Sequence, residues 1–374
     1  MHPLGDPLMS PNHPPLPHSR PTLGPEERQA ALDVLAGEHL AEGPVCRQLE
    51  QALAGAMGVR HGAVTSSGMA ALHLAMLALG VRPGDQVILP TYVCEALLDA
   101  VLYCQAQPVI VDVDAQTGNI DPAAARRAIG PQTRLIVVPH MFGTPAAMDE
   151  LLSLGVPLLE DCALAVGARC GGRPVGSMGQ ASIVSLYATK MICAGEGGAV
   201  CGDDPAVIDK VADLRDYSGR GDFHVRFNYK LTDLAAAIGL AQVAKLPSFI
   251  RRRRELARLY DLLLADLPGI ERPDADVHAE SVFYRYVVKV PAGRRDAIRA
   301  GLAEAGIQCG LGVLHPLHRL MPQAAPEPCP AGEEWARRSL SLPIYPLLSD
   351  DQAHQVAQAL RHCAESTDYT DSHS

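Results

Sequence analysis

The chain has 374 residues, of which 48% are hydrophobic and 20% are charged, and its formal net charge is −10. This length suits about two domains, and the composition excludes a disordered chain. The acidic balance, with a pI of about 5.8, argues against a nucleic-acid-binding protein, which usually carries a basic surface.

Residues 1–17 are rich in Pro and His, show no periodicity and lack the apolar core of a secretory signal, so we expect a flexible tail. No apolar run reaches the ~18 residues of a membrane span. The ten cysteines form no CxxC pair, which predicts reduced thiols, no metal site and a cytoplasmic protein.

After this tail the apolar pattern alternates between helical and extended periods. Helices are expected near 25–35, 45–57 and 70–79. Five short apolar runs then recur at 86–89, 108–113, 134–138, 156–159 and 181–187. Helix-like segments lie between them, near 93–104, 121–129 and 146–154. Runs that are apolar throughout suit strands covered on both faces, and their alternation with helices is typical of βαβ units. We predict an α/β large domain over 18–250, with a mostly parallel sheet sandwiched by helices.

The C-terminal part has a different pattern. A long helix is expected over 232–265, and it contains four consecutive arginines at 251–254. These are either a solvated helix face, the favoured interpretation, or a site for an anionic substrate. A strand, a helix, a Pro-rich stretch and a last helix follow, at 281–291, 294–305, 316–330 and 349–362. We predict a smaller α+β domain over 251–365 and a tail over 366–374.

Lys190 is the first candidate for chemistry. The chain has only five lysines, and this one follows the strand 181–187 and precedes a glycine-rich run. Ligands of open α/β sheets bind beyond the carboxyl ends of the strands, and glycines let the backbone approach them closely. The position suits a lysine that forms a Schiff base, although an ordinary surface lysine remains the alternative.

Two further features point to the same chemistry. Asp161 ends the strand that includes 156–159, and carboxylates are rarely buried without a partner. It either caps the following segment or keeps a pyridinium nitrogen protonated, as pyridoxal phosphate (PLP) requires. Ser66, Ser67 and Gly68 precede an Ala/Leu-rich helix, whose free N–H groups would bind a phosphate. Taken alone, this loop is equally typical of an ordinary helix cap.

On these residues the chain resembles the DegT/StrS family of PLP-dependent sugar aminotransferases, which have the aspartate-aminotransferase fold, known as fold type I. The resemblance spans about 18–360. It rests on motifs in a fixed order: 18–24 (HSRPTLG), 66–68 (SSG), 89–94 (LPTYVC), 160–163 (EDCA), 185–190 (SLYATK) with 195–198 (GEGG), 226–233 (RFNYKLTD), 316–318 (PLH) and 340–346 (LSLPIYP).

The resemblance implies roles for individual residues. Lys190 is expected to hold PLP covalently and to move a proton, and Asp161 to pair with the pyridine nitrogen. The phosphate is expected to be held by Ser67, by Ser185 and by the amides of Gly68 and Met69.

Other implied roles concern the substrate and the subunits. Asn228 is expected to reach the phosphate in a neighbouring subunit, which makes the functional unit a homodimer with a shared active site; its alternative is to cap the helix that begins near Thr232. Tyr187 and His318 are candidates for substrate contact, and His318 is equally an ordinary loop residue.

Three positions depart from the family pattern. Leu164 stands where Gln or His usually donates to the PLP hydroxyl, and Met69 stands where Thr is usual. Cys94 stands where an aromatic residue often stacks on the ring, and we consider Tyr92 as a nearby substitute.

The resemblance implies transfer of an amino group, with glutamate as the expected donor, to a keto carbon of a nucleotide-linked sugar. The alternatives are a sugar dehydratase of the same fold, which retention of Lys190 disfavours, and a non-catalytic regulatory relative. A nicotinamide oxidoreductase and a P-loop enzyme are excluded because their glycine motifs are absent.

Overall fold

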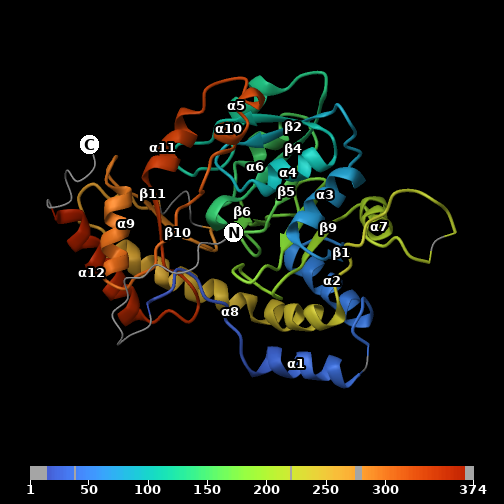
Figure 1. The fold of residues 1–374 in the computed structure, drawn as a ribbon, viewed down its shortest axis with the longest axis horizontal. Helices are drawn as coiled ribbons and strands as arrows, with labels where there is room; N and C mark the ends of the chain where they lie inside the picture. The colour runs from blue at the N-terminus through green and yellow to red at the C-terminus, as the bar shows by residue number, and fades with distance from the viewer. Residues whose placement is uncertain (1–14, 38, 220, 274–279, 367–374) are drawn as a thin grey trace.

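A computed structural model describes residues 15–37, 39–219, 221–273 and 280–366, so most of the expected tails lie outside the described residues. The chain forms a seven-stranded sheet covered by helices on both faces, and a smaller α+β unit beside it (Figure 1). The sheet order is β1-β9-β8-β5-β4-β2-β3. The strands are β1 (His61–Thr65), β2 (Gln86–Pro90), β3 (Gln107–Val111), β4 (Thr133–Pro139), β5 (Leu158–Asp161), β8 (Ala181–Ser185) and β9 (Gly198–Gly202).

The sheet is mostly parallel, as expected. Every pairing from β8 to β3 is parallel, and only β9 runs against its neighbours β1 and β8. Strands β1, β5 and β8 therefore point the same way, and their carboxyl ends lie at one edge. All five predicted strands are present, whereas β1 and β9 were not predicted.

Alternate residues of the buried strands face two different helix layers. Along β4, Leu135 and Val137 belong to the core under α3, α4 and α7, and Ile136 and Val138 belong to the core under α5 and α6. Helix α2 and the first half of α8 cover the face of the sheet that α5 and α6 also cover, near β1 and β9. The bounds are α2 (Pro44–Met57), α3 (Gly68–Ala78), α4 (Ala96–Tyr103), α5 (Pro122–Ala128), α6 (Met148–Leu152), α7 (Pro205–Leu214) and α8 (Asp233–Leu263). The sheet is thus buried on both faces, which explains its continuous apolar runs.

Several short elements complete this part of the molecule. Helix α1 (Pro25–Ala36) lies along α8, outside the main layers (Figure 1). The turn η1 (Met141–Gly143) follows β4, and β6 (Arg169–Cys170) pairs with β7 (Arg173–Pro174) in a short hairpin.

The smaller unit has its own core. An antiparallel pair of strands packs with α9 and α12, and the second half of α8 joins this core. Its elements are β10 (Tyr286–Lys289), α9 (Arg295–Glu304), β11 (Ser339–Leu342) and α12 (Asp350–Glu365). The intervening α10 (Leu317–Leu320), η2 (Pro322–Ala324) and α11 (Pro330–Arg338) pack against the core of the large sheet, to which Leu317 and Trp335 belong. Leu16 also belongs to the core of the smaller unit: it is buried and pairs with Ile307, so the expected tail is already anchored before residue 17.

Helix α8 connects the two cores, and the predicted boundary at 250/251 falls inside it (Figure 1). By length and hydropathy this helix is the one candidate membrane span among the described residues. Its buried side chains pack against α1, α2 and α12, as in the core helix of a globular protein.

Of the four arginines at 251–254, Arg251 is exposed, as a solvated helix face requires, and the other three bond to the smaller unit or to the segment before it. The buried Arg253 donates to the carbonyl oxygens of Tyr284 (3.0 Å) and Ile344 (2.8 Å). Arg252 pairs with Asp350 at 2.7 Å. The run therefore ties α8 to the smaller unit.

Candidate active site

A cavity of about 550 Å³ opens at the carboxyl edge of β1, β5 and β8. It brings together nine of the twelve residues that the sequence singled out: Ser67, Gly68, Met69, Cys94, Asp161, Leu164, Ser185, Tyr187 and Lys190. Residues that are up to 123 positions apart in the chain meet here because parallel strands end at the same edge.

Lys190 enters the cavity from the segment that follows β8. Its amide donates to the carbonyl of Tyr187 at 2.9 Å, and the amide of Ala188 donates to Gly195 at 3.0 Å. Gly195 has a φ of +85°, a conformation that favours glycine, so the glycine-rich run closes this loop without strain. The Lys190 amine lies 5.6 Å from the ring centroid of Tyr284, which forms part of the cavity wall.

Asp161 is the last residue of β5 and is only 7% exposed. Its Oδ1 accepts the amide of Ala163 at 2.9 Å, and among the described residues its other oxygen has no hydrogen-bond partner. Burial raises the pKa of Asp161 above its ordinary value, against the lowering effects of the Ala163 amide and the Lys190 charge. A cationic group in the cavity would satisfy the free oxygen and favour the ionised form.

The start of α3 provides an anion site beside these residues. Ser67 caps the helix by accepting the amide of Ala70 at 3.1 Å, which leaves the first two helical amides, those of Gly68 and Met69, without an intrahelical partner. A Cβ at position 68 would lie 2.9 Å from the Ser185 Cβ and 3.1 Å from its Oγ. Glycine is therefore needed for the helix start to approach the end of β8.

Two of the expected residues, Tyr92 and His318, do not line the cavity. Tyr92 is fully buried outside the cavity: its hydroxyl lies 2.6 Å from the Ser339 Oγ, and its ring stacks on Trp335. It does not replace the missing aromatic residue at Cys94. His318 does not line the cavity either, because Thr91 (2.5 Å) and Glu333 (2.8 Å) occupy its two ring nitrogens.

Asn228 does not line the cavity and is exposed. The cap of α8 is Thr232, whose Oγ1 accepts the amide of Ala235 at 3.2 Å, so Asn228 is not the cap. Asn228 pairs with Asp216, just after α7. The amide of Ser66, which precedes the helix start at the cavity, donates to the carbonyl of the neighbouring Tyr229 at 2.7 Å.

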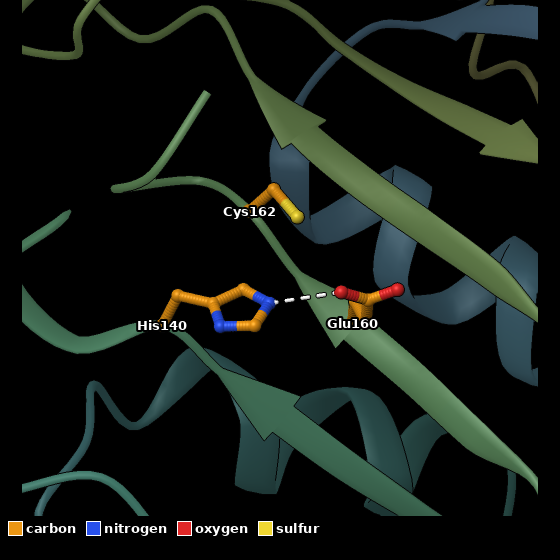
Figure 2. A group of neighbouring side chains, drawn as sticks. All are labelled: His140, Glu160 and Cys162. Atoms are coloured by element: carbon orange, nitrogen blue, oxygen red, sulfur yellow. Dashed lines mark hydrogen bonds and ion pairs between the residues drawn. The ribbon is translucent and has the colours of Figure 1, made fainter. Parts of the chain in front are cut away.

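A buried His140–Glu160 pair supports β5 just behind Asp161 (Figure 2). The Ala146 amide donates to Nδ1 of His140 at 3.0 Å, so Nε2 carries the proton and donates to Glu160 at 3.1 Å. Glu160 also accepts the amides of Gly176, Met178 and Gly179 at 2.6 to 2.7 Å. Burial opposes its ionisation, but these bonds and His140 hold the pKa of Glu160 below its ordinary value.

With Cys162, this pair forms the group of possible metal-binding side chains found within the described residues. However, both nitrogens of His140 and both oxygens of Glu160 already have hydrogen-bond partners. Burial also raises the pKa of the Cys162 thiol well above its ordinary value, which disfavours the thiolate that a metal requires. We interpret the group as a hydrogen-bonded support for β5.

Some residues of the cavity wall were not anticipated, notably Tyr284, Arg285 and Glu196. Tyr284 and Arg285 come from the smaller unit, just before β10. Only the alternation of the 281–291 strand was available from the sequence, and it does not say which residues face the large domain.

The donor set of the cavity fits PLP. An amine suits the aldehyde carbon, a buried carboxylate with a free oxygen suits the ring nitrogen, and two free amides with a serine hydroxyl suit the phosphate. Together with the mostly parallel sheet, this defines a PLP-dependent transferase of fold type I.

Comparison with known proteins identifies the family. A model of the DegT/DnrJ/EryC1/StrS aminotransferase family matches residues 21–361, and the chain belongs to this family of PLP-dependent enzymes. It is 35% identical to the UDP-N-acetyl-3-dehydro-alpha-D-glucosamine 3-aminotransferase of Acidithiobacillus ferrooxidans, covering 84% of this chain and 87% of that protein.

Two solved structures are similar throughout. The aminotransferase TlmJ from Streptoalloteichus hindustanus has a TM-score of 0.88 and 32% identity, covering 93% of this chain and 98% of that one. DesI, solved in the presence of its TDP-sugar product, has a TM-score of 0.87 and 32% identity, covering 94% of this chain and 93% of that one.

Proposed function

We propose that the chain transfers an amino group from an amino acid, glutamate in the first instance, to a keto carbon of a nucleotide-linked sugar. The observation that carries the proposal is the meeting of Lys190, Asp161 and the free amides of α3 in one cavity. The sugar class is supported by the relatives, one of which is a UDP-sugar 3-aminotransferase and another a protein solved with a TDP-sugar product.

Each side chain of the cavity then has a distinct task. When bound, PLP supplies an electron sink for the carbon that loses a proton. Lys190 attaches the cofactor through Nζ, and the same amine, once released, carries the proton to and from the substrate carbon. Asp161 keeps the ring nitrogen protonated. Ser185, Ser67 and the amides of Gly68 and Met69 bind the phosphate.

Three wall residues complete the assignment. Leu164 and Cys94 pack against the cofactor without donating the bond or the aromatic stacking usual in the family. Tyr187 is half exposed in the cavity wall and is assigned to substrate contact.

The active unit in this proposal is a homodimer with a shared site, completed by Asn228 of the second copy. The same segment exposes large apolar side chains, with Phe223 97% and Val225 71% exposed. Such side chains gathered on one surface segment mark an interaction site. We place the enzyme in the cytoplasm, because all ten cysteines lie in described residues and remain free thiols.

The deciding experiment is the visible spectrum of the purified protein with and without L-glutamate. Bound PLP makes the protein yellow, and glutamate shifts the band as the amino group moves to the cofactor. Borohydride reduction followed by peptide mapping should place the label on Lys190. A colourless protein after incubation with PLP, or a label on another lysine, would refute the proposal.

A matched pair of variants tests whether the position of the lysine decides activity. Lys190→Ala should abolish turnover while leaving the melting temperature unchanged, since no other described lysine lines the cavity. Lys210→Ala, a change in α7 away from the cavity, should leave both turnover and the label intact.

A further inference from the structure

Arg285 is a guanidinium in the wall of the active-site cavity that lacks an acidic partner. Among the described residues no carboxylate forms an ion pair with it, although its side chain is partly buried. Its Cζ lies 5.1 Å from the ring centroid of Tyr284, and the Lys190 amine lies 5.6 Å from the same centroid. A partly desolvated cation in the wall of the same cavity as the reacting amine would be satisfied by an anionic group of a ligand.

The imidazole ring of His18 is within hydrogen-bonding distance of this guanidinium. Nη1 of Arg285 lies 2.8 Å from both ring nitrogens of His18, and Nε2 of His18 lies 2.8 Å from Oγ of Ser341 in β11. A Cβ at Gly310 would come within 2.6 Å of the ring, so the imidazole occupies a slot that only glycine leaves open. The motif that contains His18 was recognised in the sequence but received no role there.

The His18 ring is a neutral partner. Burial and the charge of Arg285 lower the pKa of His18 to about 3. At neutral pH the ring therefore accepts a bond from Arg285 without repelling it. The positive charge of Arg285 stays uncompensated, and most of its five N–H donors remain available to a ligand.

We propose that Arg285 binds the α-carboxylate of the amino-acid donor, and that His18 is the positioning residue that orients the guanidinium; this rests on the proposed aminotransferase function. The carboxylate of an α-amino acid is one carbon away from the carbon that carries the amino group. An anchor for it must therefore lie in the same cavity as the Lys190 amine, and Arg285 and Lys190 both contact the Tyr284 ring in that cavity. The diphosphate of a nucleotide sugar is separated from the keto carbon by atoms of the sugar ring and does not match this placement.

The test separates the donor half-reaction from nucleotide binding. The apparent Kd for L-glutamate is taken from the spectral change of the PLP-loaded protein, and the Kd for UDP is measured by calorimetry. In Arg285→Gln we expect the glutamate Kd to rise by about 30-fold or more, since one partner of a desolvated charge pair is lost. The UDP Kd should stay within about twofold of the wild-type value, and the melting temperature should change by no more than about two degrees.

Further variants and probes sharpen the assignment. Arg285→Lys keeps the charge but loses the planar fork, so its glutamate Kd should lie between those of the wild type and Arg285→Gln. With 4-aminobutyrate, which lacks an α-carboxylate, the wild type and Arg285→Gln should behave alike. Arg272→Gln, at a neighbouring cavity, is the matched control and should change nothing.

His18 is tested by rescue. His18→Ala should raise the glutamate Kd with the maximal rate of the half-reaction unchanged, and His18→Gln, whose amide oxygen can still accept from Arg285, should recover part of the affinity. Equal loss in both variants would refute the positioning role.

Two results overturn the assignment of Arg285. One is a glutamate Kd in Arg285→Gln within threefold of the wild type, and the other is a selective loss of UDP affinity. A wild type that gives no spectral response to glutamate refutes the proposed function instead, so failure of the function and failure of the Arg285 assignment are distinguished.

Discussion

At the scale of single residues, Asp161 accepts a backbone amide and also presents a free oxygen to the cavity. Asp161→Asn keeps the bond to Ala163 but cannot stabilise a protonated ring nitrogen. We expect the protein to fold and kcat to fall by about 10²–10³, the effect of one preorganised electrostatic group, or roughly 3–4 kcal/mol. Steady-state kinetics with a melting curve checks this, and turnover near that of the wild type would make Asp161 a structural cap.

Glu160, which precedes Asp161, is expected to contribute to the stability of the fold and not to the reaction. In Glu160→Gln one oxygen becomes an NH₂ group that faces two donors, either His140 with Gly176 or Met178 with Gly179. Breaking such a buried network costs about 3–5 kcal/mol, so we expect the melting temperature to fall by several degrees.

The control for Glu160 is Glu150→Gln, an exposed residue of α6 for which we expect a change within about 0.5 kcal/mol. The pKa of Glu160 is lowered in the folded protein, so its contribution is present above the pKa of the unfolded chain and is lost as the pH falls through the folded value. The melting temperatures of the wild type and Glu160→Gln should therefore converge at acidic pH. Curves that stay separated by the same interval at every pH would contradict this.

Residue identity and order predicted nine of the residues that line the cavity, but not the rest of its wall or the direction of every side chain. Lys190, Asp161 and Ser185 follow strand ends, where the sheet itself places them at the site. Tyr92 also follows a strand end, yet it turns inward to Ser339, because a partner 247 residues away in sequence decides its direction. Local spacing carries no information about such a partner.

At the scale of elements, the start of α3 depends on the glycine that lets it approach β8. In Gly68→Ala the new methyl would contact Ser185 at 2.9 Å and push apart two groups that we assign to the phosphate. We expect weaker PLP binding, by at least tenfold in a titration of the apoprotein followed by absorbance. The loss should appear in cofactor affinity before it appears in the melting temperature.

Gly55→Ala is the matched control for this change. Gly55 lies inside α2, and a Cβ there would meet nothing within 4 Å. Alanine in a helix is favoured over glycine by roughly 0.5–1 kcal/mol, so this variant should be slightly more stable and bind PLP normally. Equal PLP affinity in both variants would show that the approach of α3 to β8 is not needed for binding.

The predicted elements fail where apolar periodicity is short or interrupted. Strands β1 and β9 have five residues each and contain or are bounded by glycine, so they resemble loop sequence, although each is completed by its neighbours in the sheet. Helix α11 lies next to a Pro-rich stretch that masks its pattern. The five sheet strands that were predicted have apolar runs without glycine, and burial alone does not separate them from β9, which is fully buried.

At the scale of the whole molecule, the cavity draws on both units, since Lys190 and Asp161 come from the large sheet and Tyr284 and Arg285 from the segment before β10. Helix α8 fixes their relative position, because it belongs to both cores and its Arg253 binds the carbonyl of Tyr284. Sequence patterns separated the two units but gave no information on how they face each other.

The proposed dimer makes a prediction about two inactive variants. Lys190→Ala and Asn228→Ala subunits are each expected to be inactive, but after mixing and refolding or exchange, a dimer of one of each contains one complete site. Random pairing makes half the dimers mixed, so activity should return to about a quarter of the wild type.

The control for this experiment pairs Lys190→Ala with Asp161→Asn. Both residues line the same cavity of one chain, so every site in the mixed dimer lacks one of them and no activity should return. Recovery with Asn228→Ala but not with Asp161→Asn therefore requires that the asparagine act across the interface. Full activity of Asn228→Ala alone, or absence of recovery after subunit exchange has been verified by mass, would show that each chain completes its own site.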